Sequence, residues 1–388
     1  MGLQQKKQFL NLEDFVNSQL SSHTNLEVNL IINQIDEQNV QVLASALAKC
    51  VNLSILTLEL GQNQIGDQGL KYLGSALSKC SNLSILTLQL YRNLIGGQSV
   101  LDLGSALIQC TSLSAFTLNL WQNSICDQGA SNLGSALQKY ENLSTLILNL
   151  GSNSIGQQGA FNLGKAIAKC TNLKSLTLWL FSNQIGSQGA LELGSSLTKC
   201  FNLSILTLDL SNNQIGNQGA SDLGFAISKY SNLTQFTLNL VQNSIGDQGA
   251  SDLGQAVQKI SNISTFSLNL SNNSIDAKGA QDLGFALSKC PRLSSLTLSL
   301  SQNQIGDLGA SNLGSVLSQY SNLSSLNLIL SSNQIGALGA SELGYALSKC
   351  SSLSVLKLDF WDNHFLIKNL RIKVLKTKRL VKMQIEQD

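Results

Sequence analysis

Apolar residues return along this chain with a fixed period of thirty positions. The period starts at Ser21 and runs without insertion to Cys350, which gives eleven copies, and an altered twelfth copy begins at Ser351. Positions within a copy are called registers 1 to 30. The copy at residues 231–260 reads SNLTQFTLNLVQNSIGDQGASDLGQAVQKI. A fixed period of this length is the sequence signature of a solenoid, in which each repeat packs only on its neighbours.

Two different apolar patterns follow one another within each copy. Registers 6, 8 and 10 alternate with other residues, as in Leu206, Leu208 and Leu210, and predict a strand with one buried face. Registers 20, 23, 27 and 30 have the spacing of one helix face, as in the range 220–230. A single copy cannot cover both apolar faces. We therefore expect the copies to be stabilised by stacking.

Three further registers repeat a residue type that needs a physical reason. Register 13 is Asn in all twelve copies, from Asn33 to Asn363, and we expect its amide to bond the backbone of its own coil and of the next one. Register 24 is Gly in ten copies, although Gly inside a helix costs about 1 kcal/mol relative to Ala, so we expect a close neighbour there. Some copies have Asp at register 17, which predicts a helix N-cap at Asp67, Asp127, Asp247 and Asp307.

The strand and turn residues carry a family resemblance. Each copy resembles a leucine-rich repeat in the run Leu203-x-x-Leu206-x-Leu208-x-Leu210-x-x-Asn213-x-Ile215. The segment that follows, GNQGASDLGFAIS, resembles the ribonuclease-inhibitor-like class, whose copies carry a full helix. The extra x-Leu before the Asn departs from the usual family spacing, and we interpret it as a strand longer by two residues. The resemblance implies an α/β, right-handed, horseshoe-shaped solenoid. It would have a parallel β-sheet on the concave face, helices on the convex face, and partners on the concave face or its rim.

The two ends of the chain depart from the repeat. In residues 1–20, helical spacing links four apolar residues: Phe9, Leu12, Val16 and Leu20. With Asn11 as its cap, this segment is predicted to form an N-terminal capping helix, followed by the eleven repeats over 21–350. Residues 351–388 are predicted to hold the degenerate twelfth repeat and a basic C-terminal capping helix. The alternative is that this basic segment contacts an acidic partner or anionic lipid.

Composition excludes several classes of protein. Charged residues make up only 12% of the chain and the net charge is +2, so nothing favours a nucleic-acid partner. No apolar run approaches the roughly 18 residues of a transmembrane segment. The first fifteen residues, MGLQQKKQFLNLEDF, lack the apolar core of a secretory signal, so we expect a cytoplasmic location.

The sequence shows no arrangement typical of catalysis. The two histidines, His23 and His364, lie at opposite ends of the array, and no nucleotide, zinc-protease, EF-hand or kinase motif occurs. We therefore expect no enzyme activity, cofactor or metal. Seven of the eight cysteines lie at register 30, where other copies have Tyr or Ile. Because these residues replace one another, we interpret the cysteines as buried space-filling side chains and not as a disulfide or metal ladder.

Function must then depend on the registers that vary. Registers 5, 7, 9 and 11 are expected on the concave face, and large aromatic residues gather at registers 9 and 11 of copies three to six. Exposed Trp, Tyr and Arg are enriched at binding hot spots. The candidate partner-binding residues are Tyr91, Arg92, Trp121, Trp179, Phe181 and Asp209. The alternative is that the aromatic residues only cover the rim or pack on one another.

The leading functional hypothesis is a non-catalytic scaffold that presents the concave surface to another protein. A second hypothesis is a GTPase-activating protein, because the Ran-activating family has similar repeats. Its members usually carry an acidic tail, whereas this chain ends in a basic segment and has Arg92 as the only arginine on the predicted concave edge. A third hypothesis is a regulatory region related to the repeat arrays that follow a kinase domain in some unicellular eukaryotes.

Overall fold

The computed structural model describes residues 6–363 and 382–386. Its internal contacts divide the chain into two compact units, Met1–Gln184 and Ile185–Asp388. The first unit contains β1 (Lys7–Phe9), α1 (Leu12–Val16), a short 3-10 helix (Leu20–Ser22), β2 (Asn25–Asn29), α2 (Glu37–Leu47), β3 (Ile55–Glu59), α3 (Asp67–Leu77), β4 (Ile85–Gln89), α4 (Gly97–Leu107), β5 (Ala115–Asn119), α5 (Asp127–Leu137), β6 (Thr145–Asn149), α6 (Gln157–Ile167) and β7 (Ser175–Trp179). The second unit contains α7 (Gly186–Leu197), β8 (Ile205–Asp209), α8 (Gly216–Ile227), β9 (Gln235–Asn239), α9 (Asp247–Gln258), β10 (Thr265–Asn269), α10 (Ala277–Ser288), β11 (Ser295–Ser299), α11 (Gly306–Leu317), β12 (Ser325–Ile329), α12 (Ala337–Leu347), β13 (Val355–Asp359) and β14 (Lys382–Glu386).

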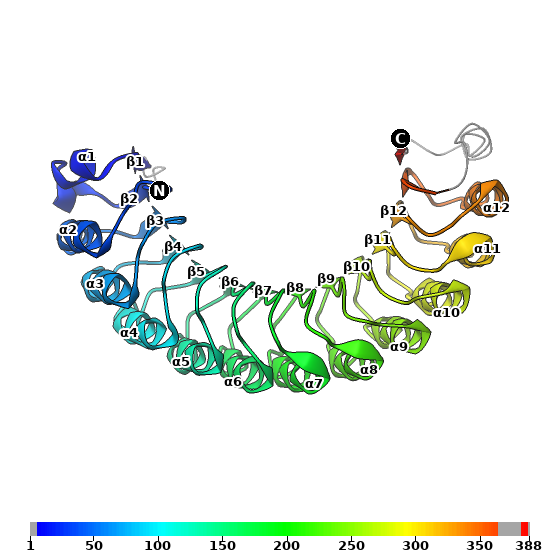
Figure 1. Ribbon diagram of the computed structural model, residues 1–388, viewed down its shortest axis with the longest axis horizontal. Helices are drawn as coiled ribbons and strands as arrows, with labels where there is room; N and C mark the ends of the chain where they lie inside the picture. The colour runs from blue at the N-terminus through cyan, green and yellow to red at the C-terminus, as the bar shows by residue number, and fades with distance from the viewer. Residues whose placement is uncertain (1–5, 364–381, 387–388) are drawn as a thin grey trace. The chain divides into compact units, whose positions relative to one another are not determined.

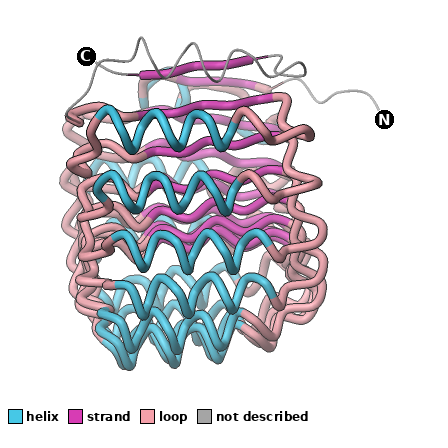
Figure 2. The backbone as a smooth tube through the Cα atoms, turned by 90° about the vertical axis from the view of Figure 1, so that its right-hand side faces the viewer, coloured by secondary structure: helices cyan, strands magenta, loops and turns pink. Residues whose placement is uncertain are grey.

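Within each unit the strands form a parallel sheet in which every strand pairs with the next one along the chain (Figure 1). The pairing keeps the thirty-residue step, since Leu56 lies opposite Leu86 and Leu206 lies opposite Phe236. The helices cover one face of the sheet, and loops join each helix to its strands at both ends of the coil (Figure 2). The opposite face of the sheet is called the open face below. The predicted α/β leucine-rich-repeat solenoid, with parallel strands alternating with helices, is confirmed.

The strand and helix faces are buried as the apolar patterns predict. Leu206, Leu208 and Leu210 are at most 1% exposed. Each repeat strand runs from register 5 to register 9, one residue short of the predicted end, but the bonding continues because the Leu60 N–H donates to the Gln89 carbonyl oxygen at 2.8 Å. Tyr230, at register 30, is buried but lies beyond the helix end at Ile227, so that register does not belong to the helix.

From Asn63 on, the asparagines at register 13 bond the backbone of two coils, as expected, but the second coil is the preceding one. The Asn63 side-chain nitrogen donates to the carbonyl oxygens of Leu30 and Leu60, both at 2.9 Å. Its side-chain oxygen accepts from the N–H groups of Asn33 and Ile35 at 3.1 and 3.0 Å. The nitrogen also donates to the Gly61 carbonyl oxygen at 3.2 Å, so one amide bonds five backbone groups where the chain turns out of the sheet.

The glycines at register 24 lie where the next helix crosses closely, which confirms the expected close neighbour. A Cβ atom added at Gly134 would lie 2.8 Å from the Cβ atom of Ala166, and one at Gly224 would lie 3.2 Å from that of Ala256. Both alanines are at register 26 of the following helix. The helical penalty of glycine is thus offset by close helix packing.

The prediction that the register-17 aspartates cap their own helices was wrong. Helix α3 begins at Asp67 itself, after Gly66 as its N-cap. The Asp67 carboxylate instead accepts from the Gly96 N–H at 2.7 Å and from the Ser99 hydroxyl at 2.6 Å, both in the following repeat. Asp307 likewise accepts from the Gly336 N–H, the N-cap of α12. These carboxylates therefore bond the first turn of the next helix and fasten adjacent repeats.

The cysteines at register 30 are buried free thiols, as predicted for side chains that fill space in the core. Cys170 donates its thiol to the Leu137 carbonyl oxygen at 3.3 Å, and burial raises its pKa to about 11. Tyr140 and Tyr230 replace Cys at this register, and each donates its hydroxyl to a carbonyl oxygen in the preceding copy. The eighth cysteine, Cys126, lies at register 16 and is exposed.

The N-terminal segment differs in part from the expected capping helix. Asn11 caps a helix, since its side-chain oxygen accepts from the Asp14 N–H at 2.8 Å, but that helix has only five residues. Phe9 lies in strand β1, which pairs with β2, and Leu20 lies in the short 3-10 helix. The residue that fills the core is Phe15, with its ring 5.5 Å from that of Phe9. The helical periodicity missed the strand because β1 has three residues, too few to show a period.

The predicted C-terminal capping helix falls mainly outside the described residues. Strand β13 follows the repeat pattern through Asp359. Residues 382–386 form a strand, β14, that pairs in parallel with β13, with Met383 opposite Leu356. This part of the segment is therefore strand and not helix.

Candidate functional site

The aromatic candidates all lie on the first unit, at or just after the ends of its strands. Trp179 is the last residue of β7, at register 9. Tyr91, Trp121 and Phe181 are at register 11, two residues after their strands end. These four residues are half-buried and are called the aromatic row below. Arg92 follows Tyr91 and is exposed.

A left-handed backbone at register 12 orients the residue beside each ring. Arg92 has φ of +51° and Gln122 has φ of +54°, and the same conformation recurs at this register in every copy from Ile32 to Asp362. This region is sparsely populated by residues with a Cβ. It is held because the register-12 N–H continues the inter-strand bonding, as Arg92 donates to the Trp121 carbonyl oxygen at 2.8 Å. In a regular strand, the Arg92 side chain would point to the face opposite Tyr91. With its positive φ, the side chain instead reaches the Trp121 ring.

Tyr91, Arg92 and Trp121 form a stack. The Tyr91 and Trp121 ring centroids are 6.1 Å apart with an interplanar angle of 33°. The Arg92 guanidinium carbon lies 4.7 Å from the Trp121 ring centroid, a cation–π distance. Arg92 Nε donates to the Gln122 side-chain oxygen at 2.7 Å, and Trp121 Nε1 donates to the Ser152 hydroxyl at 3.1 Å. These bonds hold the flat groups in fixed orientations.

Two glycines make room for the rings. Gly61 and Gly151 are at register 11 of the copies before Tyr91 and Phe181, and a Cβ atom at either glycine would meet the following aromatic ring. Each ring therefore lies against the backbone of the previous copy. In the sequence, each of these glycines is followed thirty residues later by an aromatic residue. The repeat pattern alone does not indicate that the two residues contact each other.

The structure brings together only part of the predicted site. Trp179 lies opposite Asn149 in the paired strands, and Phe181 follows it by two residues. Among the described aromatic residues, neither of these two forms a ring pair with Tyr91 or Trp121. The aromatic row thus consists of one ring pair, Tyr91 and Trp121, and of two further residues, Trp179 and Phe181, that lie two copies after Trp121.

Asp209 lies in the second unit, where its carboxylate has local partners. It accepts from the Ser211 N–H at 2.9 Å, the Ser211 hydroxyl at 2.6 Å and the Asn239 side-chain nitrogen at 2.9 Å. Each Asn or Asp at register 9 in the described residues accepts from the N–H two residues on: Asn29, Asn119, Asn149, Asp209, Asn239, Asn269 and Asp359. This local Asx-turn bond shapes the strand end, so register 9 is largely a structural position.

Acidic residues lie beside the aromatic row on the open face. Burial, followed by the nearby Glu27 carboxylate, raises the pKa of Glu59 above its usual value, while Lys6 acts in the opposite direction. Lys6 forms an ion pair with Glu27, and Gln8 Nε2 donates to the Glu27 carboxylate at 2.8 Å. The N-terminal segment therefore balances part of the negative charge at this end of the sheet.

The described residues were also compared with the side-chain groups that hold a metal ion. They contain no group of three or more His, Cys, Asp or Glu side chains placed to hold a metal ion. His23 is buried beside Phe9, it hydrogen-bonds the Ser18 hydroxyl at 2.8 Å, and burial and the charge of Lys7 lower its pKa. A histidine in this setting fills the N-terminal core. Across the described ranges, no helix combines the length and apolar character that a membrane span needs.

Comparison with known proteins identifies the class of repeat. The family model described as Leucine Rich repeat matches residues 51–74, 201–224, 237–254, 267–284, 293–314 and 322–344. The chain therefore carries leucine-rich repeats, and repeats of this class commonly serve as protein-interaction scaffolds. A search of the curated proteins found no match.

Proposed function

We propose that this protein is a non-catalytic scaffold that binds another protein through the open face of its sheet. The observation that carries the proposal is the stack of Tyr91, Arg92 and Trp121, which presents flat aromatic and guanidinium surfaces in fixed orientations. Rigid groups lose little conformational entropy on binding, and these residue types dominate binding hot spots. Asp209 is left out of the proposed surface because its carboxylate already has three partners in the second unit.

Two finer assignments belong to the same proposal. The helices α2 to α12 have 11 or 12 residues each, which supports the ribonuclease-inhibitor-like class with a full helix in each repeat. The seven buried cysteines are free thiols, which supports a reducing compartment such as the cytoplasm. The Arg92 side chain is stacked on Trp121 and bonded to Gln122, so a binding role suits it better than the role of a GTPase-activating arginine.

The test is affinity capture from an extract of the protein's own cells, comparing the wild type with the Tyr91→Ala, Trp121→Ala double variant. We expect the double variant to lose a partner that the wild type retains. Because both rings are half-exposed, the free energy of unfolding should fall by only about 1–2 kcal/mol. The change in unfolding is measured by urea titration.

The matched control is Trp361→Ala, which removes an exposed tryptophan at the same register in the second unit. This variant should capture the partner as the wild type does. Equal capture by the wild type and the double variant would exclude the proposed surface. Stimulation of GTP hydrolysis by a small GTPase would favour the activating-protein hypothesis instead.

A further inference from the structure

In the second unit, positive charge gathers at one edge of the stacked repeats. Six segments run from the last turn of a helix to the first residue of the next strand, and together they are called the basic edge below: residues 195–205, 225–235, 255–265, 285–295, 315–325 and 345–355. Because the strands of this unit pair in parallel and in register, these segments lie side by side at one end of the coils (Figure 2). The segments contain no Asp or Glu and six basic residues: Lys199, Lys229, Lys259, Lys289, Arg292 and Lys349.

The net charge of the whole chain hides this separation. The other residues of the range 185–363 include eleven Asp or Glu and only two Lys. All six basic residues of the edge are exposed, and none of them forms an ion pair within the part of the chain that the structure describes. The lysines follow the C-terminal ends of their helices, where a cation also opposes the helix dipole. The dipole accounts for lysines at this edge but not for apolar residues beside them.

Exposed aromatic side chains lie among these cations. Four of them are 51 to 73% exposed: Phe201, Phe225, Phe285 and Tyr345. The last three are at register 25, in the last turn of α8, α10 and α12, and a lysine ammonium lies over each ring. The distances from the ammonium to the ring centroid are 4.5, 4.7 and 4.2 Å in the pairs Lys229–Phe225, Lys289–Phe285 and Lys349–Tyr345. The basic edge therefore repeats a pair made of one ring and one cation.

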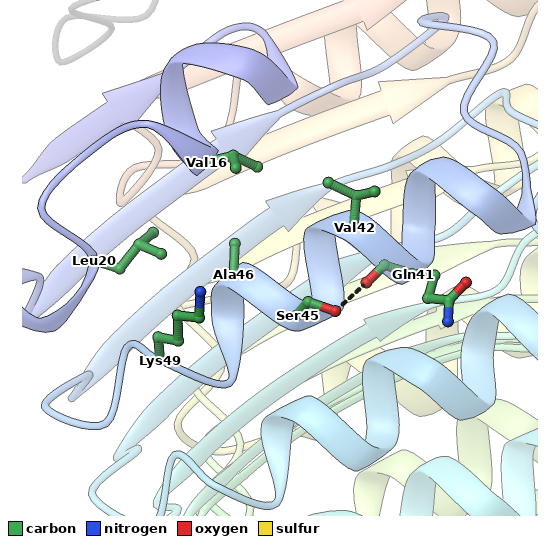
Figure 3. Close-up of a pocket in the computed structure, with 7 residues that line it drawn as sticks. All are labelled: Val16, Leu20, Gln41, Val42, Ser45, Ala46 and Lys49. Carbon is green, nitrogen blue, oxygen red and sulfur yellow. Dashed lines mark hydrogen bonds between the residues drawn. The ribbon is translucent and has the colours of Figure 1, made fainter.

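The repeat folds without these rings. Register 25 has no aromatic residue in the first unit, where it is Ser in four copies and Lys in the fifth. Figure 3 shows the same two registers in α2, where Ser45 stands at the position of the ring and Lys49 at that of the lysine. The Ser45 hydroxyl donates to the Gln41 carbonyl oxygen at 2.8 Å, so a polar residue is satisfied there within its own helix. Repeated exposed rings that the scaffold does not require point to a contact with another surface.

The chemistry of the edge indicates what that surface is. It must be anionic along several coils, and it must accept aromatic rings between its charges. The surface of an anionic lipid bilayer meets both conditions, because its headgroups attract lysines and its interfacial layer is where aromatic side chains of membrane proteins concentrate. Lysine can also keep its ammonium at the headgroups while its stem lies along apolar material.

A nucleic-acid strand suits the edge less well. Successive bases stack about 3.4 Å apart, whereas the rings of α8 and α10 are separated by a whole helix, which corresponds to about 16–20 Å at usual helix spacing. One face of each ring at register 25 is already occupied by an ammonium. Only one of the six cations, Arg292, has the planar fork that binds phosphate through two bonds, and its Nη1 donates to the Asn262 side-chain oxygen at 2.7 Å.

We infer that the basic edge of the second unit binds the surface of an anionic lipid bilayer. The lysine ammonium groups lie at the lipid headgroups, and the rings of Phe201, Phe225, Phe285 and Tyr345 enter the interfacial layer. None of these residues belongs to the aromatic row, so the inference does not depend on the protein-binding surface proposed above.

The test is sedimentation of the full chain with vesicles of phosphatidylcholine that contain about 30% phosphatidylserine. We expect saturable binding to these vesicles and at least about tenfold weaker binding to vesicles of phosphatidylcholine alone. Binding should also weaken in about 0.5 M sodium chloride, because salt screens exposed charges.

The contribution of the rings is tested by the double variant Phe225→Ser, Phe285→Ser, which should bind anionic vesicles at least about tenfold more weakly. Serine is the commonest residue at this register, so the variant should fold, and circular dichroism checks this. The matched control is Leu308→Gln, Leu338→Gln. It removes two exposed apolar side chains at register 18, at the other end of the helices, where most copies have Gln. The control should bind as the wild type does.

The contribution of the charge is tested by Lys229→Gln, Lys289→Gln, which should also weaken binding at least about tenfold. Register 29 is Gln in two other copies, so the scaffold accepts this residue. The matched control, Lys278→Gln, Lys357→Gln, removes the same charge outside the basic edge and should bind within about twofold of the wild type.

Three outcomes would overturn the inference. The first is no saturable binding of the wild type to anionic vesicles, or equal binding to neutral ones. The second is binding that both edge variants leave unchanged, or that the controls weaken equally, which would place the contact elsewhere, such as in the basic residues 364–388. The third is binding to a single-stranded oligouridylate that both edge variants abolish while vesicles are not bound, which would make a nucleic acid the occupant.

Discussion

The two units share one scaffold and differ in what they present at register 11 of the open face. The first unit has Tyr91, Trp121 and Phe181 there, whereas four of the six copies of the second unit have Ser, such as Ser271, and Trp361 in the last copy is the aromatic exception. The Ser271 hydroxyl bonds the side chains of Asn269 at 2.7 Å and Ser299 at 2.8 Å, so these small polar groups satisfy one another. The rings of the first unit instead keep exposed faces. The same repeat scaffold thus carries small polar groups that bond one another in one unit and, in the other, the rings that we propose as a binding surface.

The largest expected effect is on the free energy of unfolding, and it compares the contribution of one buried strand leucine in each unit. Leu88→Ala in the first unit and Leu208→Ala in the second each remove a side chain that is at most 1% exposed. Each should lower the free energy of unfolding by about 2–5 kcal/mol, because a cavity remains. Urea titration measures both values. A loss in only one unit would show that the two units do not share the same packing.

A smaller effect is expected from filling the space beneath one ring. Gly61→Ala places a methyl group where the Tyr91 ring lies, so the ring must shift away from Trp121. We expect partner capture to weaken several-fold, by less than in the double variant that lacks both rings, and the tryptophan fluorescence to change. Ser211→Ala, at the same register in the second unit, is the control. Unchanged capture and fluorescence in Gly61→Ala would contradict a preorganised stack.

The smallest effect concerns the charge beside the aromatic row. The raised pKa of Glu59 means that the folded state favours its neutral form, so ionisation at neutral pH is unfavourable to folding. Glu59→Gln should therefore raise the melting temperature slightly at pH 7. The gain should disappear below the unfolded pKa of about 4.3, where wild-type Glu59 is also neutral. Melting curves across this pH range check the sign, and a gain that persists at pH 3 would contradict this cause.

Much of the fold could be predicted because its signals are local and repeated. The alternation around Leu206 and Leu208 and the spacing from Ala220 to Ile227 each describe one face of one element. The register-24 glycines predicted a close helix contact, because glycine inside a helix costs free energy and its repetition needs a compensating contact. The helix face could not be followed to Tyr230, however, because apolar spacing does not show where a helix ends.

The candidate site could be predicted only in its residue types. The sequence located the aromatic row on the first unit but gave no sign that Arg92 turns onto the Trp121 ring. That turn depends on the positive φ at register 12. It likewise presented Asp209 as a variable surface residue, whereas its bond to the Ser211 N–H is a local turn bond. Alternation indicates which residues share a face but not what each polar atom bonds.

The sequence by itself determined the repeat, the alternation of parallel strands and helices, and the apolar faces that stack. A period of thirty positions and two short apolar periods require no knowledge of distant contacts. Only the tertiary structure decided which neighbouring coil each polar group joins. Asn63 bonds the coil before it and Asp67 the coil after it, although both repeat with the same period. The physical reason is that a hydrogen bond depends on the direction of a side chain in space. Periodicity gives the position of a side chain along the chain and leaves that direction open.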